Sequence, residues 1–120
     1  MGHILIAEDD DAMRNFLARS LERAGHEVVA VGSGTEALPH IASEQFDLLL
    51  TDIVMPGMDG LALAKRAAIL APGMKVVFIT GFAAVALNHG DEPVTAEARV
   101  LSKPFHLKDV VAAIDELTAA

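Results

Sequence analysis

The feature that most constrains the fold is a regular alternation between short apolar runs and longer segments with helical periodicity. Each apolar run has four to six residues, which is too short for a stable helix and typical of a strand buried on both faces. Between the runs, apolar residues recur every three or four positions, which predicts amphipathic helices. The predicted strands cover residues 3–7, 28–31, 47–51, 75–80 and 99–102.

Strands that alternate with helices in this way are typical of a parallel sheet with crossover helices on both faces. The predicted helices cover residues 12–24, 35–41, 61–70 and a last segment around 110–117. We expect the second helix to be short or kinked, because Pro39 lacks an amide donor. Residues 88–98 show no period and are expected to form an irregular loop.

Composition excludes several classes of function. A chain of 120 residues is long enough for one core, so we expect a single domain over residues 1–120. The 17 acidic residues outnumber the 9 basic ones, and the net charge of -8 repels nucleic acids and anionic membranes. No apolar run approaches the roughly 20 residues that span a bilayer. With no cysteine in the sequence, we expect a cytoplasmic protein.

Polar residues follow or end four of the five predicted strands. Glu8 and Asp9 come directly after the first strand, and Asp52 comes after the third. The fourth strand ends on Thr80, and Lys103 follows the fifth. Because the carboxyl ends of parallel strands meet along one edge of the sheet, we expect these side chains to lie close together.

This set of residues points to a divalent cation and to phosphorus chemistry. Neighbouring carboxylates stay ionised together only beside a counter-cation, and hard oxygen ligands select Mg²⁺ over zinc or copper. Beside such an ion, Asp52 can act as an oxygen nucleophile toward phosphorus, assisted by Lys103 and Thr80. In the alternative interpretation, the acids after the first strand simply cap the next helix.

The sequence resembles the receiver domains of bacterial two-component response regulators over almost its whole length. The resemblance is carried by the acids at 8–10, the loop at 52–60, the strand end at 78–82 and the Lys-Pro-Phe sequence at 103–105. It implies a flavodoxin-like fold, in which a five-stranded parallel sheet has the strand order 2-1-3-4-5. It also implies a signalling switch that takes phosphate from a histidine kinase or a histidine phosphotransferase.

The resemblance assigns a role to each residue of the expected site. Asp52 would be the phosphoacceptor, and Lys103 would bind the phosphoryl group. Asp9, Asp52 and the backbone carbonyl of Val54 would ligate Mg²⁺, and Glu8 would bind the ion directly or through water. The protein would then catalyse only its own phosphorylation and hydrolysis, and would not be an enzyme that turns over a substrate.

A closer likeness, to a single-domain member of this family, rests on residues 8–11, 78–84 and 101–107. It implies output through the ClpXP protease, as an adaptor whose activity phosphorylation switches off. Only three residues follow Leu117, so we expect no effector domain and output by protein contact. The resemblance also favours a monomer. In the family, a regular helix-to-strand connection contributes to a common dimer face, and here the irregular segment 88–98 stands in its place.

One position departs from the pattern of the family. Most receivers carry Tyr or Phe three residues before the lysine that binds phosphate, and here that position is Val100. Phe82 lies two residues beyond Thr80 and is the nearest aromatic ring along the chain. We therefore expect Thr80 and Phe82 to form the switch.

Two other functions remain open from the sequence. The first is a Mg²⁺-dependent phosphatase with an aspartate nucleophile, because the acids at 9–11 imitate an Asp-x-Asp motif. The second is a binding module that works without phosphorylation. The five histidines show no metal-ligand spacing, so we expect them at surface or edge positions without a chemical role. They are His3, His26, His40, His89 and His106.

Overall fold

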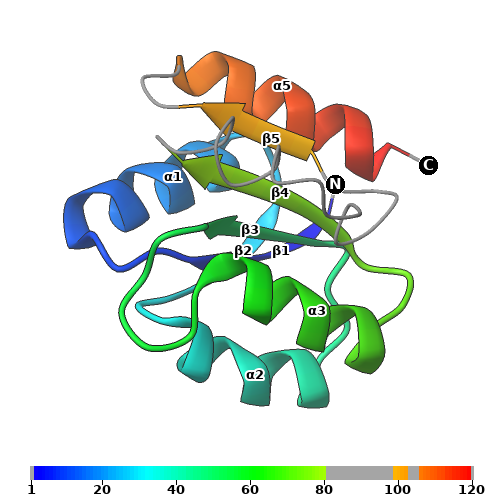
Figure 1. Ribbon diagram of the computed structural model, residues 1–120. Helices are drawn as coiled ribbons and strands as arrows, with labels where there is room; N and C mark the ends of the chain where they lie inside the picture. The colour runs from blue at the N-terminus through cyan, green and yellow to red at the C-terminus, as the bar shows by residue number, and fades with distance from the viewer. Residues whose placement is uncertain (1, 81–98, 103–105, 120) are drawn as a thin grey trace.

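The computed structural model describes residues 2–80, 99–102 and 106–119, with the backbone alone at residue 80 and at 99–102. The strands are β1 (His3–Ala7), β2 (Glu27–Val31), β3 (Leu48–Asp52), β4 (Lys75–Thr80) and β5 (Arg99–Ser102). The helices are α1 (Asp11–Arg23), α2 (Gly34–Ser43), α3 (Gly60–Leu70) and α5 (Leu107–Thr118). Figure 1 shows these elements along the chain.

The five strands form one sheet in the order β2-β1-β3-β4-β5, and every neighbouring pair is parallel. In the register, Ile4 pairs with both Val28 and Leu48, so β1 lies between β2 and β3. The predicted flavodoxin-like fold is confirmed. In this order the carboxyl ends of all five strands lie along one edge of the sheet, and the amino ends lie along the other.

The helices cover both faces of the sheet, α1 and α5 on one and α2 and α3 on the other (Figure 1). Side chains of successive strand residues point to opposite faces. Within β1, Ile4 and Ile6 therefore pack with α1 and α5, whereas Leu5 and Ala7 pack with α2 and α3. The sheet is buried from both sides, which explains why its strands read as continuous apolar runs.

Several of the predicted element boundaries shift by one residue. α1 begins at Asp11 and β2 at Glu27, one residue before the predicted starts, and β3 ends on Asp52 instead of on the residue before it. At α1 the shift has a local cause. The Asp10 carboxylate accepts a hydrogen bond from the Met13 amide at 2.8 Å, which fixes the first turn of the helix.

The helix α2 is the shortest of the four described helices, with 10 residues, but it continues beyond Pro39 to Ser43. The prediction that it ends near residue 41 is therefore wrong. Ser33 caps the helix by accepting the Glu36 amide, and the Ser43 hydroxyl donates to the Pro39 carbonyl at 2.8 Å. These contacts stabilise both ends of a helix that has lost one internal hydrogen bond.

The histidines are expected at surface or edge positions, and a surface position is wrong for His26, which is buried directly before the edge strand β2. Only 6% of the residue is exposed. Its Nδ1 accepts the Gly2 amide at 2.9 Å, and its Nε2 donates to the Asp115 carboxylate at 2.6 Å. His26 thus joins the start of β1 to the carboxyl-terminal half of α5. Both ring nitrogens are satisfied, which makes burial of the polar ring tolerable.

The irregular segment predicted at 88–98 lies outside the described residues. Within the described ranges, none of the helices combines the length and the apolar character needed to cross a bilayer.

Candidate functional site

Acidic side chains gather at the edge formed by the carboxyl ends of the strands. Glu8 follows β1 directly, and its amide donates to the Val31 carbonyl at 3.1 Å, so the pairing with β2 continues past the end of β1. Asp52 is the last residue of β3. Because β1 and β3 are neighbours in register, the two residues meet at adjacent strand ends.

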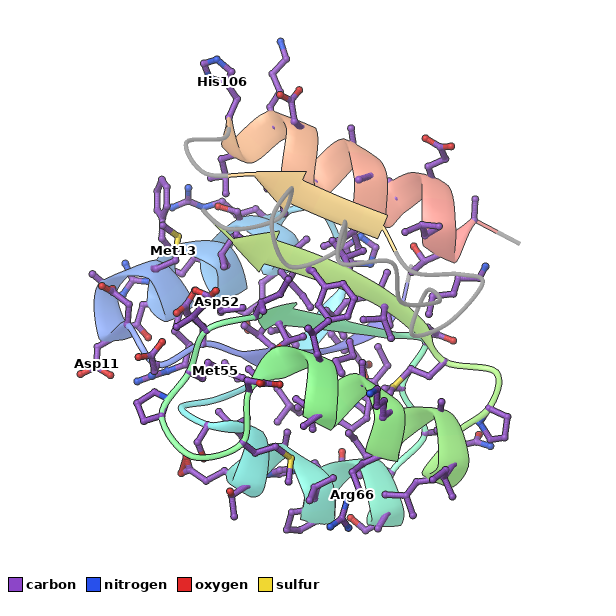
Figure 2. All side chains as sticks on the ribbon, in the orientation of Figure 1. Asp11, Met13, Asp52, Met55, Arg66 and His106 are labelled. Carbon is purple, nitrogen blue, oxygen red and sulfur yellow. The ribbon has the colours of Figure 1, made fainter. Side chains whose placement is uncertain are left out.

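Carboxylate oxygens of Glu8, Asp9 and Asp52 all lie within 4.8 Å of one another. Glu8 is 2% exposed and Asp52 is 7% exposed, whereas Asp9 is exposed. Asp52 follows Leu48 and Leu50 in the alternation of β3, on the face covered by α1 and α5. In Figure 2, Asp52 lies near Met13 of α1 at the edge where the strand arrows end. We call these three acids the acidic cluster.

The next two acids in the sequence have other partners. Asp10 caps α1, and Asp11 accepts a hydrogen bond from the Arg14 guanidinium at 2.6 Å. Arg14 also donates to the Glu8 carbonyl at 2.9 Å. The run of four acids therefore divides into a helix start at residues 10–11 and a cluster at residues 8–9. The capping interpretation was right for Asp10, and sequence reasoning missed the contact made by Arg14.

The backbone around Asp52 is tightly packed. The Val54 amide donates to Asp52 Oδ1 at 3.3 Å, and the Thr51 hydroxyl donates to the Asp52 carbonyl at 2.9 Å. The Gly60 amide donates to the Ile53 carbonyl at 2.8 Å. A Cβ at Gly60 would lie only 2.1 Å from the Asp52 carbonyl oxygen, so only glycine fits there. A glycine in the sequence can signal a close approach, but it does not tell which backbone atom is approached.

The cluster has the donor set that a magnesium ion prefers. Mg²⁺ binds oxygen ligands at about 2.1 Å in octahedral geometry, so opposite ligands stand about 4.2 Å apart. Oxygens within 4.8 Å of one another can reach one such ion with small side-chain movements. A cation would also offset the repulsion among three neighbouring carboxylates. The residues present therefore fit the group that the sequence predicts.

The structure describes only some of the other predicted site residues. Thr80 ends β4, in register with Ser102 at the end of β5, so its backbone lies at the same edge as the acidic cluster. Val100 lies within β5. Lys103 and Phe82 lie outside the described residues, and their predicted roles stay predictions.

Comparisons with known proteins agree with this geometry. The chain is 52% identical to the response regulator receiver protein CpdR of Brucella abortus (strain 2308), over all of this chain and 99% of CpdR. It spans between 12% and 24% of three longer relatives.

Solved structures show the same fold. A CheY-like receiver domain protein from Methanospirillum hungatei matches 97% of the chain at 35% identity, with a TM-score of 0.85 over 92% of that structure. The receiver domain of the hybrid histidine kinase CckA matches 98% of the chain at 32% identity, with a TM-score of 0.84 over all of that domain.

The family assignment rests on more than overall shape. The family model of the response regulator receiver domain matches residues 4–115, from β1 into α5. Receiver domains are signalling switches that bind Mg²⁺ at an acidic pocket, and an acidic cluster is what the strand ends assemble here. The strand order, the acids at the carboxyl edge and the match along the chain lead to one conclusion: this protein belongs to the response regulator receiver domains.

Proposed function

We propose that the protein is a phosphoaccepting switch of a two-component phosphorelay, with Asp52 as its phosphoacceptor. A histidine kinase or a histidine phosphotransferase supplies the phosphoryl group. The observation that supports this proposal is the position of Asp52 at the end of β3. Its side chain is nearly buried, and its carboxylate lies within 4.8 Å of oxygens from two other acids. Such a group of neighbouring carboxylates favours a bound cation, which is the setting that phosphoryl transfer to a carboxylate needs.

In the proposed transfer, a carboxylate oxygen of Asp52 attacks the phosphorus of a phosphohistidine. An O–P bond forms and gives an acyl phosphate, while the P–N bond breaks and its electron pair stays on the imidazole. The Val54 amide, which donates to Asp52 Oδ1, orients the carboxylate for this attack. We assign a hydrogen bond to the phosphoryl group to Thr80, and charge pairing with it to Lys103.

Glu8, Asp9, Asp52 and the backbone carbonyl of Val54 are the proposed ligands of Mg²⁺. When bound, the ion supplies positive charge beside the oxygens of the transferring phosphoryl group. Glu8 is held for this role, because its carboxylate accepts the Asp10 amide at 3.2 Å and its carbonyl accepts Arg14. The chain thus orients an inner acid, Glu8, beside an outer and accessible one, Asp9.

The test is incubation of the full chain with Mg²⁺ and acetyl phosphate, followed by intact mass measurement. The wild-type protein should gain the mass of one phosphoryl group, and Asp52→Asn should gain none. Asp11→Asn is the matched control, because Asp11 lies in the same acidic run but pairs with Arg14 outside the cluster. It should gain the phosphoryl group as the wild-type protein does.

Each other outcome of this experiment favours a different function. Equal gain by the wild-type protein and Asp52→Asn, or gain by neither, contradicts Asp52 as phosphoacceptor. If neither protein gains the mass of a phosphoryl group, the function that remains is a binding module that works without phosphorylation. Steady release of inorganic phosphate from phosphate esters, with many turnovers per molecule, favours the phosphatase.

The proposed switch pairs Thr80 with Phe82, because Val100 stands where most receivers carry an aromatic residue. Phosphorylation adds up to two negative charges at the acidic edge, and a preference of a few kcal/mol for one arrangement makes a minor state the major one. Phe82→Ala should leave phosphoryl uptake intact and remove its effect on partner binding. An unchanged effect on binding would refute this switch.

The proposed output is protein contact by a cytoplasmic monomer that regulates the ClpXP protease. Support comes from the likeness to a single-domain receiver, CpdR, over the whole chain. Purified ClpX should bind the unmodified protein and should lose that binding after treatment with acetyl phosphate. Asp52→Asn should bind under both conditions. Absence of binding to ClpX in both states would contradict this output, while the phosphoacceptor role is tested separately by the mass measurement.

A further inference from the structure

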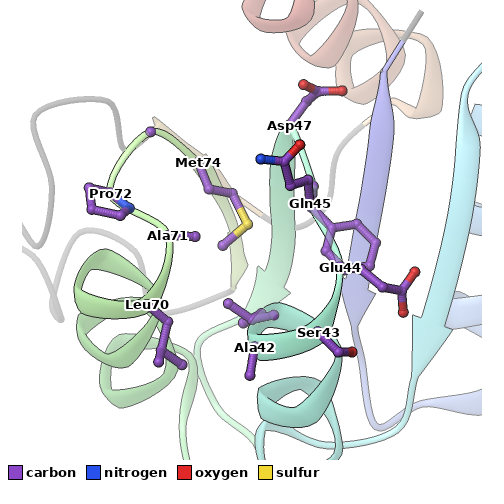
Figure 3. Close-up of a pocket in the computed structure, with 12 residues that line it drawn as sticks. Ala42, Ser43, Glu44, Gln45, Asp47, Leu70, Ala71, Pro72 and Met74 are labelled. Carbon is purple, nitrogen blue, oxygen red and sulfur yellow. The ribbon is translucent and has the colours of Figure 1, made fainter.

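A cleft opens at the amino edge of the sheet, opposite to the acidic cluster, where α2 and α3 end (Figure 3). It is lined by residues 41–47, from the last residues of α2 through the connection to β3, and by residues 70–74, from the end of α3 into the connection to β4. Its volume is about 560 Å³. Ligand pockets typically measure about 300–1,000 Å³, so the cleft is large enough for several side chains of a partner.

The floor of the cleft is apolar, and apolar surface continues onto its rim. Ile41, Phe46 and Met74 line the cleft and are each at most 7% exposed. Leu70 on the rim is 49% exposed, and its neighbour Ile69 at the end of α3 is 79% exposed. Adjacent exposed apolar side chains beside a cleft indicate a contact surface, unlike single ones scattered over the protein.

The lining also carries negative charge. Its 12 residues include two carboxylates, Glu44 and Asp47, and neither Lys nor Arg. His40 Nδ1 donates to Glu44 at 2.8 Å, and the His3 amide donates to Asp47 at 2.8 Å, so both acids are held in place. The carboxyl-terminal carbonyls of α2 and α3 add partial negative charge at the same opening.

We propose that this cleft binds an extended, basic segment of a partner protein. One apolar side chain of the segment packs on Met74 and Leu70, and a following Arg or Lys reaches Glu44, whose carboxylate points away from Met74 and Leu70 in Figure 3. The Gln45 side chain, which extends from the connection between α2 and β3 toward Met74 in Figure 3, is placed to hydrogen-bond the backbone of the segment.

Charge complementarity selects this occupant. An acidic segment is repelled both by the lining and by the net charge of -8 of the whole chain. A second copy of the chain carries the same negative charge and is disfavoured for the same reason. The aliphatic stem of Arg or Lys can cover the apolar rim while its charged head reaches a carboxylate. Binding here does not depend on phosphoryl transfer, because the acidic cluster lies at the other edge.

The test is selection of phage-displayed octapeptides on the full chain, followed by titration of the selected peptides by fluorescence anisotropy. We expect selected sequences to join Arg or Lys with Leu, Ile, Met or Phe. Leu70→Glu and Glu44→Lys should each raise the Kd at least about tenfold. Glu44→Gln keeps an oxygen that can accept a hydrogen bond from His40. It should raise the Kd, but by less than Glu44→Lys does. Circular dichroism melting verifies that each variant is folded.

Matched controls lie on α1, far along the chain from the cleft. Phe16→Glu changes a side chain that is 57% exposed, and Glu22→Lys reverses an exposed acid. Both should leave the Kd within about twofold of the wild-type value, because distant sites act independently. Asp52→Asn should bind the same peptides equally well, so loss of the phosphoacceptor and loss of the docking cleft are distinguishable.

Several results would overturn the proposal. They are selected peptides without a basic residue, peptides that bind cleft variants and controls alike, and a selection that yields no binder above background. Sedimentation tests the remaining occupant. A dimer that forms with rising concentration and is removed by Leu70→Glu would assign the cleft to a second copy of the chain.

Discussion

Acidic side chains have different neighbours at the two edges of the sheet. At the carboxyl edge, Glu8, Asp9 and Asp52 face one another within 4.8 Å. At the amino edge, acids face histidines: Asp115 lies 2.6 Å from His26, and Glu44 lies 2.8 Å from His40. A histidine N–H that donates to a carboxylate stabilises its charge, whereas neighbouring carboxylates repel one another and favour a bound cation.

Two glycines, one at each edge, differ in how tightly the backbone around them is packed. At the carboxyl edge, the start of α3 touches the Asp52 carbonyl so closely that Gly60 has no room for a side chain. At the amino edge, a Cβ on Gly73 would have no atom within 4 Å. The start of α3 is therefore fixed against the end of β3, whereas Gly73 borders the open cleft.

The largest expected effect is the difference in stability between alanine substitutions at these two glycines. Gly60→Ala should lower the free energy of unfolding by at least about 3 kcal/mol, because the new methyl group meets backbone atoms that cannot move aside. Gly73→Ala is the control and should change it by less than about 1 kcal/mol. Urea unfolding of both variants measures the difference. Similar values for the two variants would contradict the contrast in packing.

The next effect concerns magnesium. At about a hundred times its Kd, Mg²⁺ should raise the free energy of unfolding by about 2.7 kcal/mol, because it binds the folded state. Asp9→Asn should remove most of this gain, and chelation should reverse it. Glu44→Gln alters an acid at the amino edge and should keep the full gain. Stabilisation that persists in Asp9→Asn would place the ion elsewhere.

A smaller effect is expected where an acid is paired. Asp115→Ala should lower the free energy of unfolding by about 1–3 kcal/mol, because it leaves the buried ring of His26 without one of its partners. Thermal unfolding compares this variant with Asp109→Ala, a change at an exposed acid in the first turn of the same helix. An effect no larger than that of the control would show that the pairing contributes little.

The smallest effect has the opposite sign. Without Mg²⁺, Asp9→Asn should raise the free energy of unfolding by about 0.5 kcal/mol, because it removes one of three neighbouring negative charges near the surface. Urea unfolding in the presence of a chelator measures this change. Destabilisation by Asp9→Asn under these conditions would mean that repulsion within the cluster is already relieved in the metal-free protein.

The sequence was sufficient for the sheet and for the acids at its carboxyl edge. Strands buried on both faces leave continuous apolar runs, and parallel strands bring the residues that follow them to one edge, so Glu8, Asp9 and Asp52 could be placed together. Helix starts were less certain, because Asp10 could belong either to the cluster or to the cap of α1. Only the geometry of its hydrogen bond to Met13 separates the two.

Contacts between distant parts of the chain could not be predicted. His26 pairs with Asp115, 89 positions away, and nothing near His26 in the sequence marks it as buried. The contact between Gly60 and the Asp52 carbonyl depends on where the loop after β3 returns to the sheet. The cleft at the amino edge arises from two connections that become neighbours only when α2 and α3 pack together.

The central claim is that Asp52 is the acid that accepts phosphate. An acyl phosphate can be reduced by borohydride to an alcohol, which marks the modified residue permanently. Protein treated with acetyl phosphate and Mg²⁺, then reduced and digested, should show this conversion by mass spectrometry at position 52 and at no other acid. Conversion at Glu8 or Asp9, or an unmodified position 52 in protein that carries the phosphoryl mass, would contradict the account.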